Sequence, residues 1–320
     1  MKEVDLLVEP LLEELEAGYD GLHVVALGGG HGLAEALRAI LGYADTITAV
    51  VGVADDGGSS GRLAPALSIP PPGDIRRALL ALSPEPSVWR RLIDFRFEGG
   101  DVAGHSLGNL IIAALTDLSG SFEDALHTVG RLLGARGAVV PAAAVPLVLE
   151  ADVDGEVVRG QVAIARSRGR ITDIRVLPEG TQATRAARDA ILAADQIVLG
   201  PGSLFTSLIA GLKVQGIAEA VTASKGRFVY VCNLTTQDGE TLGMTGADHV
   251  AALQAVGGVR APDAVVAHDG PLAVPAGLTR VTVDPGEIGF GVHSGDIADP
   301  EASWPQHDPA RLGAMLRRLA

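Results

Sequence analysis

The sequence predicts an α/β fold that combines a parallel sheet with an antiparallel β insertion. Residues 23–41 and 196–208 share one pattern, in which a short apolar run is followed by a glycine-rich bend and a stretch with helical periodicity. A buried strand that leads through a glycine turn into a helix is typical of parallel sheets with crossover helices. Between these segments, residues 147–177 contain β-type runs joined by turn residues, which indicates the insertion.

The composition favours a cytoplasmic globular protein. A chain of 320 residues is long enough to bury a core, and its single cysteine, Cys232, excludes an intrachain disulfide. The first residues lack the basic-then-apolar layout of a signal peptide. The most apolar run, residues 138–149, is too short to span a bilayer and is broken by Pro141 and Pro146. We therefore expect a cytoplasmic location without membrane insertion.

The charge pattern argues against nucleic acid as a partner. The formal net charge is -14, and no basic run is longer than two residues. Phosphate backbones require clustered Lys and Arg, and single-stranded nucleic acids also require aromatic platforms. Only 3% of the residues are aromatic, so neither requirement is met.

Two regions are expected along the chain. Residues 1–20 have the pattern of an acidic amphipathic helix, an extension that packs on the domain surface or on a partner subunit. Residues 21–320 are expected to form one nucleotide-binding domain, with the β insertion at about residues 147–178. The insertion should contain three strands, over residues 147–153, 156–165 and 170–177, because Asp154-Gly155 is a strong hairpin signal.

The first glycine turn is a candidate phosphate site. Residues 23–27 predict a buried strand, residues 28–32 a tight turn and residues 33–41 a helix. Leu33 stands where the dinucleotide pattern G-x-G-x-x-G has its third glycine, so a turn that merely permits close packing remains an alternative.

The next predicted strand, residues 47–53, leads into a loop rich in carboxylates, glycines and serines. Such a loop allows backbone N–H groups and hydroxyls to approach a ligand. Asp55 follows the first turn at nearly the spacing of a ribose-binding acid. Asp55 and Asp56 are also candidates to hold Mg²⁺ beside a substrate phosphate, the only cofactor that we expect.

Two predicted helices begin in polar residues. Asp74 is the expected N-cap of a helix whose first turn contains Arg76 and Arg77, an unfavourable arrangement for the helix dipole unless an anion lies nearby. Pairing with surface acids is the alternative explanation. His105, Ser106 and Asn109 could share one face of a later helix, although no catalytic triad can be inferred. His105 could equally be a structural residue.

The second half repeats the α/β pattern. A helix over residues 183–193 and a strand over residues 196–199 precede a turn with two glycines and three hydroxyl residues, a candidate anion site. A strand over residues 227–232 ends in polar residues. Residues 263–268 should form the last strand, and residues 309–319 the closing helix. The sequence contains no Cys/His cluster, so we expect no structural zinc site.

Six of these motifs, in this order, resemble the YvcK-type gluconeogenesis factors, a branch of the superfamily that includes the CofD 2-phospho-L-lactate transferases. The motifs begin at Gly28, Asp55, Pro72, Gly104, Leu199 and Cys232. The resemblance implies a Rossmann-like three-layer fold that binds a UDP-sugar such as UDP-N-acetylglucosamine or another nucleotide. It implies a regulatory role that links carbon metabolism to cell-wall synthesis and cell shape, without an established catalytic activity. Proteins of cell-wall synthesis are the implied partners, and a homo-oligomer is an open alternative.

Two alternatives stay open at this point. The chain could be a transferase of the CofD kind, which acts with Mg²⁺ on a guanylated donor and a deazaflavin, or a scaffold that acts through protein contacts. Three departures from the family pattern are present: His31 replaces Thr, Ala210-Gly211 replaces Pro-Asn, and Gln306 replaces Arg. The last one concerns ligand affinity, if the family's Arg contacts the sugar nucleotide. No catalytic residue is predicted. The residues expected to contact the ligand are Gly28, Gly29, Gly30, Gly32, Asp55, Asp56, Gly57, Gly58, Ser59, Ser60, Asp74, Arg76, His105, Ser106, Asn109, Gly200, Gly202, Ser203, Thr206, Asn233 and Thr236.

Overall fold

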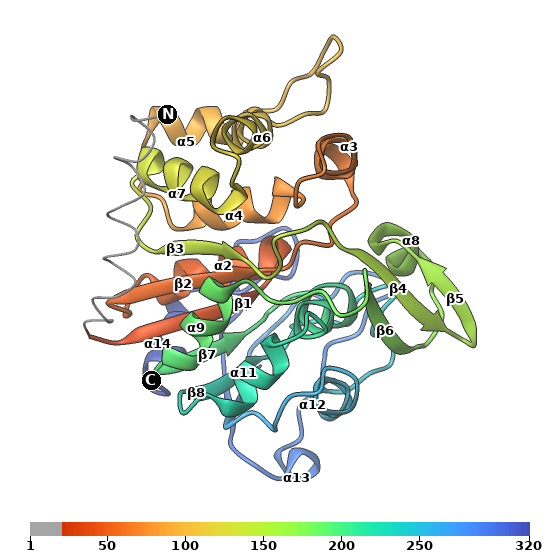
Figure 1. Cartoon of the computed structure of the whole chain (residues 1–320). Coiled ribbons are helices and arrows are strands. Elements are labelled where there is room, and N and C mark those ends of the chain that lie inside the picture. The colour runs from red at the N-terminus through yellow and green to blue at the C-terminus, as the bar shows by residue number, and fades with distance from the viewer. Residues whose placement is uncertain (1–20) are drawn as a thin grey trace.

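A parallel sheet forms the centre of the structure, a computed structural model that describes residues 21–320 (Figure 1). The helix predicted for residues 1–20 lies outside the described residues. Within the described part, seven strands pair in parallel, which confirms the predicted α/β class. Their order across the sheet is β10 (Val292–Gly295), β9 (Ala264–His268), β8 (Arg227–Val231), β7 (Gln196–Leu199), β1 (His23–Gly28), β2 (Thr46–Val51) and β3 (Ala138–Pro141).

The central strands are buried along their whole length because helices cover both faces of the sheet. Every residue of β1, β7 and β9 is buried. The helices α2 (Gly30–Ile40) and α14 (Pro309–Arg317) pack together behind the sheet in Figure 1, and α9 (Arg185–Ala193) and α11 (Ile217–Ala223) pack in front of it. The fold is therefore a three-layer sandwich.

The order of the strands reverses at β1. From β1 the chain continues to β2 and β3 on one side, and later fills the other side from β7 to β10. Because parallel crossovers are right-handed, the helices that follow β1 and β7 lie on opposite faces, and their first turns separate. A crevice at the carboxyl ends of β1 and β7 results, which is where open α/β sheets bind ligands.

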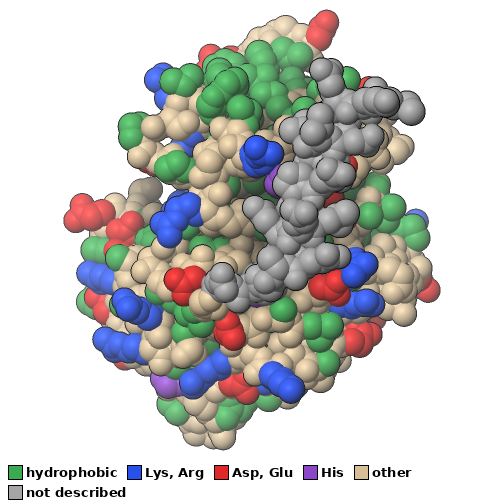
Figure 2. Space-filling model, turned by 60° about the vertical axis from the view of Figure 1, so that its left-hand side comes forward, with side chains coloured by type: hydrophobic (Ala, Val, Ile, Leu, Met, Phe, Trp, Pro, Cys, Tyr) green, Lys and Arg blue, Asp and Glu red, His purple; other side chains and the backbone are tan. Residues whose placement is uncertain are grey.

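A helical lobe covers the β3 edge of the sheet, at the top of Figure 1. Its surface is partly apolar: Val88, Trp89, Phe95 and Leu118 are all exposed. Figure 2 shows hydrophobic side chains gathered at this end of the molecule. The lobe consists of α3 (Gly58–Leu67), α4 (Pro72–Ala81), α5 (Val88–Asp94), α6 (Leu107–Ser119) and α7 (Phe122–Leu133).

Three local predictions differ from the structure. The loop after Asp55 is already helical from Gly58 onward, as the start of α3. Asp74 is not the N-cap of α4, because the helix begins two residues earlier at Pro72, whose fixed φ suits a first helical position. The strand β9 is not the last one, since β10 adds to its free edge after a loop that contains the short helix α13 (Pro285–Ile288).

The insertion is a three-stranded antiparallel sheet in which β4 (Val148–Val153) lies between β5 (Glu156–Arg159) and β6 (Ile171–Leu177). Asp154 and Gly155 have positive φ angles of 51° and 86°, as the predicted hairpin turn requires. The second predicted strand is too long. It ends at Arg159, and α8 (Gln161–Arg166) follows, held by a hydrogen bond from the Val162 N–H to the Asp56 carboxylate.

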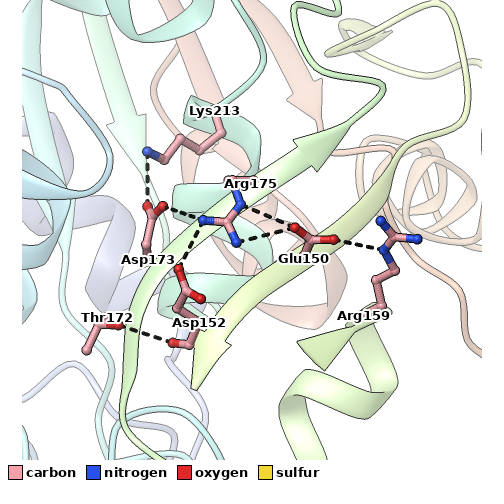
Figure 3. Close-up of polar contacts among 7 residues, drawn as sticks. All are labelled: Glu150, Asp152, Arg159, Thr172, Asp173, Arg175 and Lys213. Carbon is pink, nitrogen blue, oxygen red and sulfur yellow. Dashed lines mark hydrogen bonds and ion pairs between the residues drawn. The ribbon is translucent and has the colours of Figure 1, made fainter. Parts of the chain in front are cut away.

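An ion-pair network fastens the insertion to the main domain (Figure 3). Arg175 on β6 contacts the carboxylates of Glu150 and Asp152 on β4 at 3.3 and 3.0 Å, and that of Asp173 at 3.2 Å. Lys213, which follows α10 (Ala210–Leu212), reaches Asp173 from the main domain at 3.5 Å. The three carboxylates raise the pKa of Arg175.

The remaining elements agree with the sequence pattern. The π-helical turn η1 (Leu204–Ile209) leads into α10, and α12 (Gly246–Ala255) begins after the capping residue Thr245. Cys232 is a buried strand-end thiol, as expected, and burial raises its pKa to about 12. No helix in residues 21–320 is long and apolar enough to cross a membrane.

Candidate functional site

A cavity of about 1130 Å³ opens at the carboxyl ends of β1, β2, β7 and β8, at the reversal point of the sheet. It brings together motifs that lie more than 200 residues apart in the chain. The predicted ligand residues that line it are Gly28, Gly29, Gly30, Gly32, Asp55, Asp74, Gly202, Ser203, Thr206, Asn233 and Thr236.

The two glycine turns touch each other through their backbones. A Cβ atom added at Gly32 would lie 2.3 Å from the carbonyl oxygen of Pro201, which no side chain can tolerate. A Cβ atom at Gly29 would lie 2.7 Å from a carboxylate oxygen of Asp74. Close approach of backbone therefore requires glycine at position 32, in agreement with the packing role that the sequence left open.

The first turn of α2 faces the cavity. The first N–H groups of a helix have no partner within the helix, and the N-cap residue Gly29 has no side chain to supply one. One of these groups, the Gly30 N–H, is bonded to the Asp74 carboxylate. Burial lowers the pKa of His31 in this turn, and Arg77 lowers it further. The start of α2 thus has the donors and the dipole of an anion site.

Of the two neighbouring arginines, Arg77 lines the cavity and Arg76 does not. The Arg77 guanidinium pairs with Asp74 at 2.5 Å. Arg76 is only 5% exposed and points to the other side of α4, where its Nη1 contacts the Asp94 carboxylate at 2.6 Å. Burial lowers the pKa of Arg76. The positive charge that the sequence assigned to Arg76 is provided to the cavity by Arg77.

The two adjacent acids, Asp55 and Asp56, diverge. Asp55 lines the cavity, whereas Asp56 accepts the hydrogen bond from α8. Asp74 is a second carboxylate in the cavity lining: burial raises the pKa of Asp74, and the charge of Asp55 raises it further. Within residues 21–320 no group of three or more His, Cys, Asp or Glu side chains is placed to hold a metal ion. A cation here would use Asp55, Asp74 and ligand phosphates, which suits Mg²⁺.

At the second turn, as at the first, a protein carboxylate reaches the helix start, and here it accepts two backbone N–H groups. Glu240 accepts hydrogen bonds from the backbone N–H groups of Phe205 and Thr206 at 3.1 and 3.2 Å, and from the Thr206 hydroxyl at 2.5 Å. Burial raises the pKa of Glu240, although these donors act in the opposite direction. The backbone N–H groups of Phe205 and Thr206 are thus bonded within the protein. The ligand contacts expected at Gly200, Gly202 and Ser203 stay a prediction.

The other groups of the second turn are also engaged. Gly200 donates its N–H to the Leu27 carbonyl group at 3.2 Å. The Asn233 amide accepts from the Gly202 N–H at 3.1 Å and donates to the Gly202 carbonyl oxygen at 2.8 Å, so it shapes the turn. The Thr236 hydroxyl pairs with Thr279. The Gly200 and Gly202 N–H groups are therefore bonded within the protein.

A second polar cluster lies outside the cavity lining. The Ser59 hydroxyl is 3.0 Å from Nδ1 of His105 and accepts a hydrogen bond from the Asn109 amide at 3.1 Å. Ser60 accepts the Gly73 N–H at 3.0 Å, and Ser106 donates to the Ile93 carbonyl oxygen. These bonds connect α3 to α4 and α6. With the glycines Gly57 and Gly58, they fix the loop that carries Asp55.

The cluster does not present a nucleophile to the cavity. Ser59 is 4% exposed, and burial lowers the pKa of His105, as do the neighbouring Arg62 and Arg96. A serine and a neutral imidazole are adjacent, but none of the described contacts of His105 is to a carboxylate that would orient it. The contacts predicted between these residues and a ligand stay a prediction.

Several lining residues were not predicted. Arg77, Glu35, Gln237, Trp304 and His307 all face the cavity. Glu35 lies on the same helix as the first turn, one and a half turns further along, so its position could have been inferred from helical periodicity. The others come from segments whose position depends on tertiary packing.

Comparisons with known proteins agree with this architecture. Residues 24–286 match the family described as 2-phospho-L-lactate transferase CofD. A relative from Mycobacterium tuberculosis is 42% identical over 308 residues, which cover 92% of this chain and 89% of the relative. The gluconeogenesis factor of Bacillus subtilis is 47% identical over 232 residues, which cover 72% of this chain and 73% of the relative.

A solved structure supports the same assignment. The crystal structure of a UPF0052 family member from Bacillus halodurans has a TM-score of 0.88 to this chain at 38% sequence identity, and covers 93% of this chain and 100% of that one. The fold and the matched length agree. The chain belongs to the CofD family, on the branch of the gluconeogenesis factors.

Proposed function

We propose that this protein is a cytoplasmic regulator that binds a nucleotide sugar, of the UDP-N-acetylglucosamine class, and couples carbon metabolism to cell-wall synthesis and cell shape. The observation that carries the proposal is the cavity at the reversal point of the sheet, where the start of α2 and Arg77 offer donors and positive charge. A cavity of about 1130 Å³ is large enough for a nucleotide with a sugar attached. The names of the gluconeogenesis factor relatives support the regulatory role.

In this proposal the diphosphate binds at the start of α2. The helix N-terminus and Arg77 neutralise its charge, and Asp55 binds the ribose or, together with Asp74, a Mg²⁺ ion on the phosphates. Ser203 and Thr236 line the opposite wall. Glu240 and Asn233 give the second turn its shape.

Calorimetric titration with UDP-N-acetylglucosamine, with and without Mg²⁺, tests the proposal. We expect saturable binding, and no heat at millimolar ligand would refute it. A dependence of the affinity on Mg²⁺ would place the ion between the ligand and the Asp55–Asp74 pair.

Arg77→Ala should weaken binding of UDP-N-acetylglucosamine about tenfold or more, because a hydrogen bond to a charged group contributes about 1.5–3 kcal/mol. Its effect on stability should be small, since its ion pair with Asp74 is partly exposed. Arg76→Ala should give the reverse pattern: it removes a buried side chain outside the cavity, so it lowers stability and leaves the affinity nearly unchanged. Calorimetry and urea denaturation of both variants measure the two effects. Equal losses of affinity in Arg77→Ala and Arg76→Ala would contradict the assignment of Arg77 as the arginine that contacts the ligand.

A second candidate is a transferase of the CofD kind. It is favoured by the match of residues 24–286 to the transferase family and by the carboxylates of Asp55 and Asp74 in the same cavity, which suit a metal-assisted reaction. Release of GMP from a guanylated donor in the presence of a deazaflavin would support this candidate. Binding of UDP-N-acetylglucosamine without turnover would support the regulator.

A further inference from the structure

A buried histidine–carboxylate pair lies in the wall of the cavity and has no part in the proposed diphosphate contacts. His307 is 4% exposed, and the Glu35 side chain is 13% exposed. Oε2 of Glu35 accepts the His307 backbone N–H at 3.1 Å and lies 3.4 Å from Nδ1 of its ring. One carboxylate oxygen therefore accepts a hydrogen bond from the backbone of this histidine and lies within ion-pair distance of its ring.

Rigid elements fix the position of the pair relative to the first glycine turn. Glu35 belongs to α2, the helix that starts in this turn. His307 directly precedes Asp308, the N-cap of α14, and α14 packs against α2. The backbone around His307 pairs with residues 297–299, through the Asp308 N–H to Ile297 and the Asp299 N–H to Gln306. The backbone of His307 is thus fixed by the packing of α14 on α2 and by its pairing with residues 297–299.

The contact with Glu35 determines the role of the other ring nitrogen. A nitrogen beside a carboxylate carries the hydrogen, so a neutral His307 keeps its hydrogen on Nδ1 and leaves Nε2 as an acceptor. Nε2 is buried and has no hydrogen-bond partner among the described residues. Buried polar atoms without a partner are rare and costly, and they call for a specific explanation. Here the residue lines the cavity, so a ligand is the natural partner.

We propose that Nε2 of His307 accepts a hydrogen bond from a hydroxyl group of the bound nucleotide sugar, and that Glu35 is its positioning residue. The partner must be a donor. The diphosphate offers no donor near neutral pH, whereas the ribose and the sugar carry several hydroxyl groups. The inference rests on the proposed function for the identity of the ligand. It adds a second polar contact region, on the C-terminal wall, to the phosphate contacts at the start of α2.

Two substitutions separate the roles of the two ring nitrogens. In His307→Asn the amide group takes the place of Nδ1 beside Glu35, but nothing takes the place of Nε2. In His307→Gln the amide group reaches the place of Nε2. We expect His307→Asn to bind UDP-N-acetylglucosamine about tenfold more weakly at an unchanged thermal midpoint. We expect His307→Gln to retain more of the affinity. Wild-type affinity in His307→Asn would overturn the proposal.

His293→Asn is the matched control, because His293 lies on β10 and does not line the cavity. It should leave the affinity unchanged. Comparing UDP-N-acetylglucosamine with UDP locates the contact. If the affinity difference between the two ligands disappears in His307→Asn, the hydroxyl belongs to the sugar; a loss for both ligands assigns it to the ribose.

Nitrogen NMR of the imidazole at about pH 8, where an ordinary histidine is neutral, tests the pair without a ligand. The hydrogen should reside on Nδ1, and Glu35→Gln should increase the other tautomer. A hydrogen on Nε2 in the wild type would overturn the proposal. If UDP-N-acetylglucosamine fails to bind, the proposed function is wrong, and UDP and GDP become the probes. The inference is then rejected if neither shifts the Nε2 resonance.

Discussion

Glu240→Ala should lower the free energy of unfolding by about 3 kcal/mol or more. The substitution removes the acceptor of three hydrogen bonds. They come from the backbone N–H groups of Phe205 and Thr206 and from the Thr206 hydroxyl group. Thr206 and Phe205 are buried, so water cannot replace the carboxylate without local opening. A buried donor left without a partner costs about 1–3 kcal/mol, and three donors are affected here.

Urea denaturation of wild type and variant measures this effect. Glu219→Ala is the matched control, because Glu219 also accepts a backbone N–H at a helix start, that of Gly216 at α11, but in an exposed position. Glu219→Ala should lower the free energy of unfolding by at most about 1 kcal/mol. A loss of this small size in Glu240→Ala as well would show that Glu240 does not hold the start of η1.

Gly32→Ala should reduce binding of UDP-N-acetylglucosamine by more than about tenfold and lower the free energy of unfolding by about 1–3 kcal/mol. The new Cβ atom would lie 2.3 Å from the Pro201 carbonyl oxygen and 2.6 Å from its carbon atom. The atoms that the new Cβ would meet belong to the backbone of Pro201 and Gly202, so no flexible side chain can move aside. The turns must separate, and the donors at the start of α2 lose their alignment.

Gly211→Ala provides the control for this substitution. Gly211 also lies in a helix and lines the cavity, but a Cβ atom there meets no atom within 4 Å. Its stability should be unchanged or slightly higher, because alanine favours the helix. Titration calorimetry and denaturation of the two variants should therefore give different results. Similar affinities in both variants would contradict the role of the contact between the turns.

The parts of the site that the sequence predicted are those with local signals. The turns at Gly28 and Gly202 each follow an apolar run and precede a helix, and both lie at the cavity. A parallel sheet places the carboxyl ends of its strands on one edge, so the polar residues after β2 and β8 were expected there as well. Asp55 and Asn233 are the examples.

The parts that were missed depend on contacts distant in sequence. Glu240 lies 34 residues after Thr206, and no local pattern connects the two. The orientation of Asp56 depends on α8, which belongs to the insertion. Arg76 and Arg77 are neighbours in sequence, and the packing of α4 decides which one faces the cavity. Arg76 precedes the buried Leu79 and Leu80 by three and four residues, and this spacing could have indicated its buried side.

The proposed function requires that the diphosphate of a nucleotide sugar binds at the start of α2. A crystal structure of the protein with UDP-N-acetylglucosamine is the most direct test. We predict phosphate oxygens within hydrogen-bond distance of the first N–H groups of α2 and of the Arg77 guanidinium, with Glu240 still bonded to Thr206. Phosphates in the place of the Glu240 carboxylate, or a ligand bound outside the cavity, would contradict the proposal.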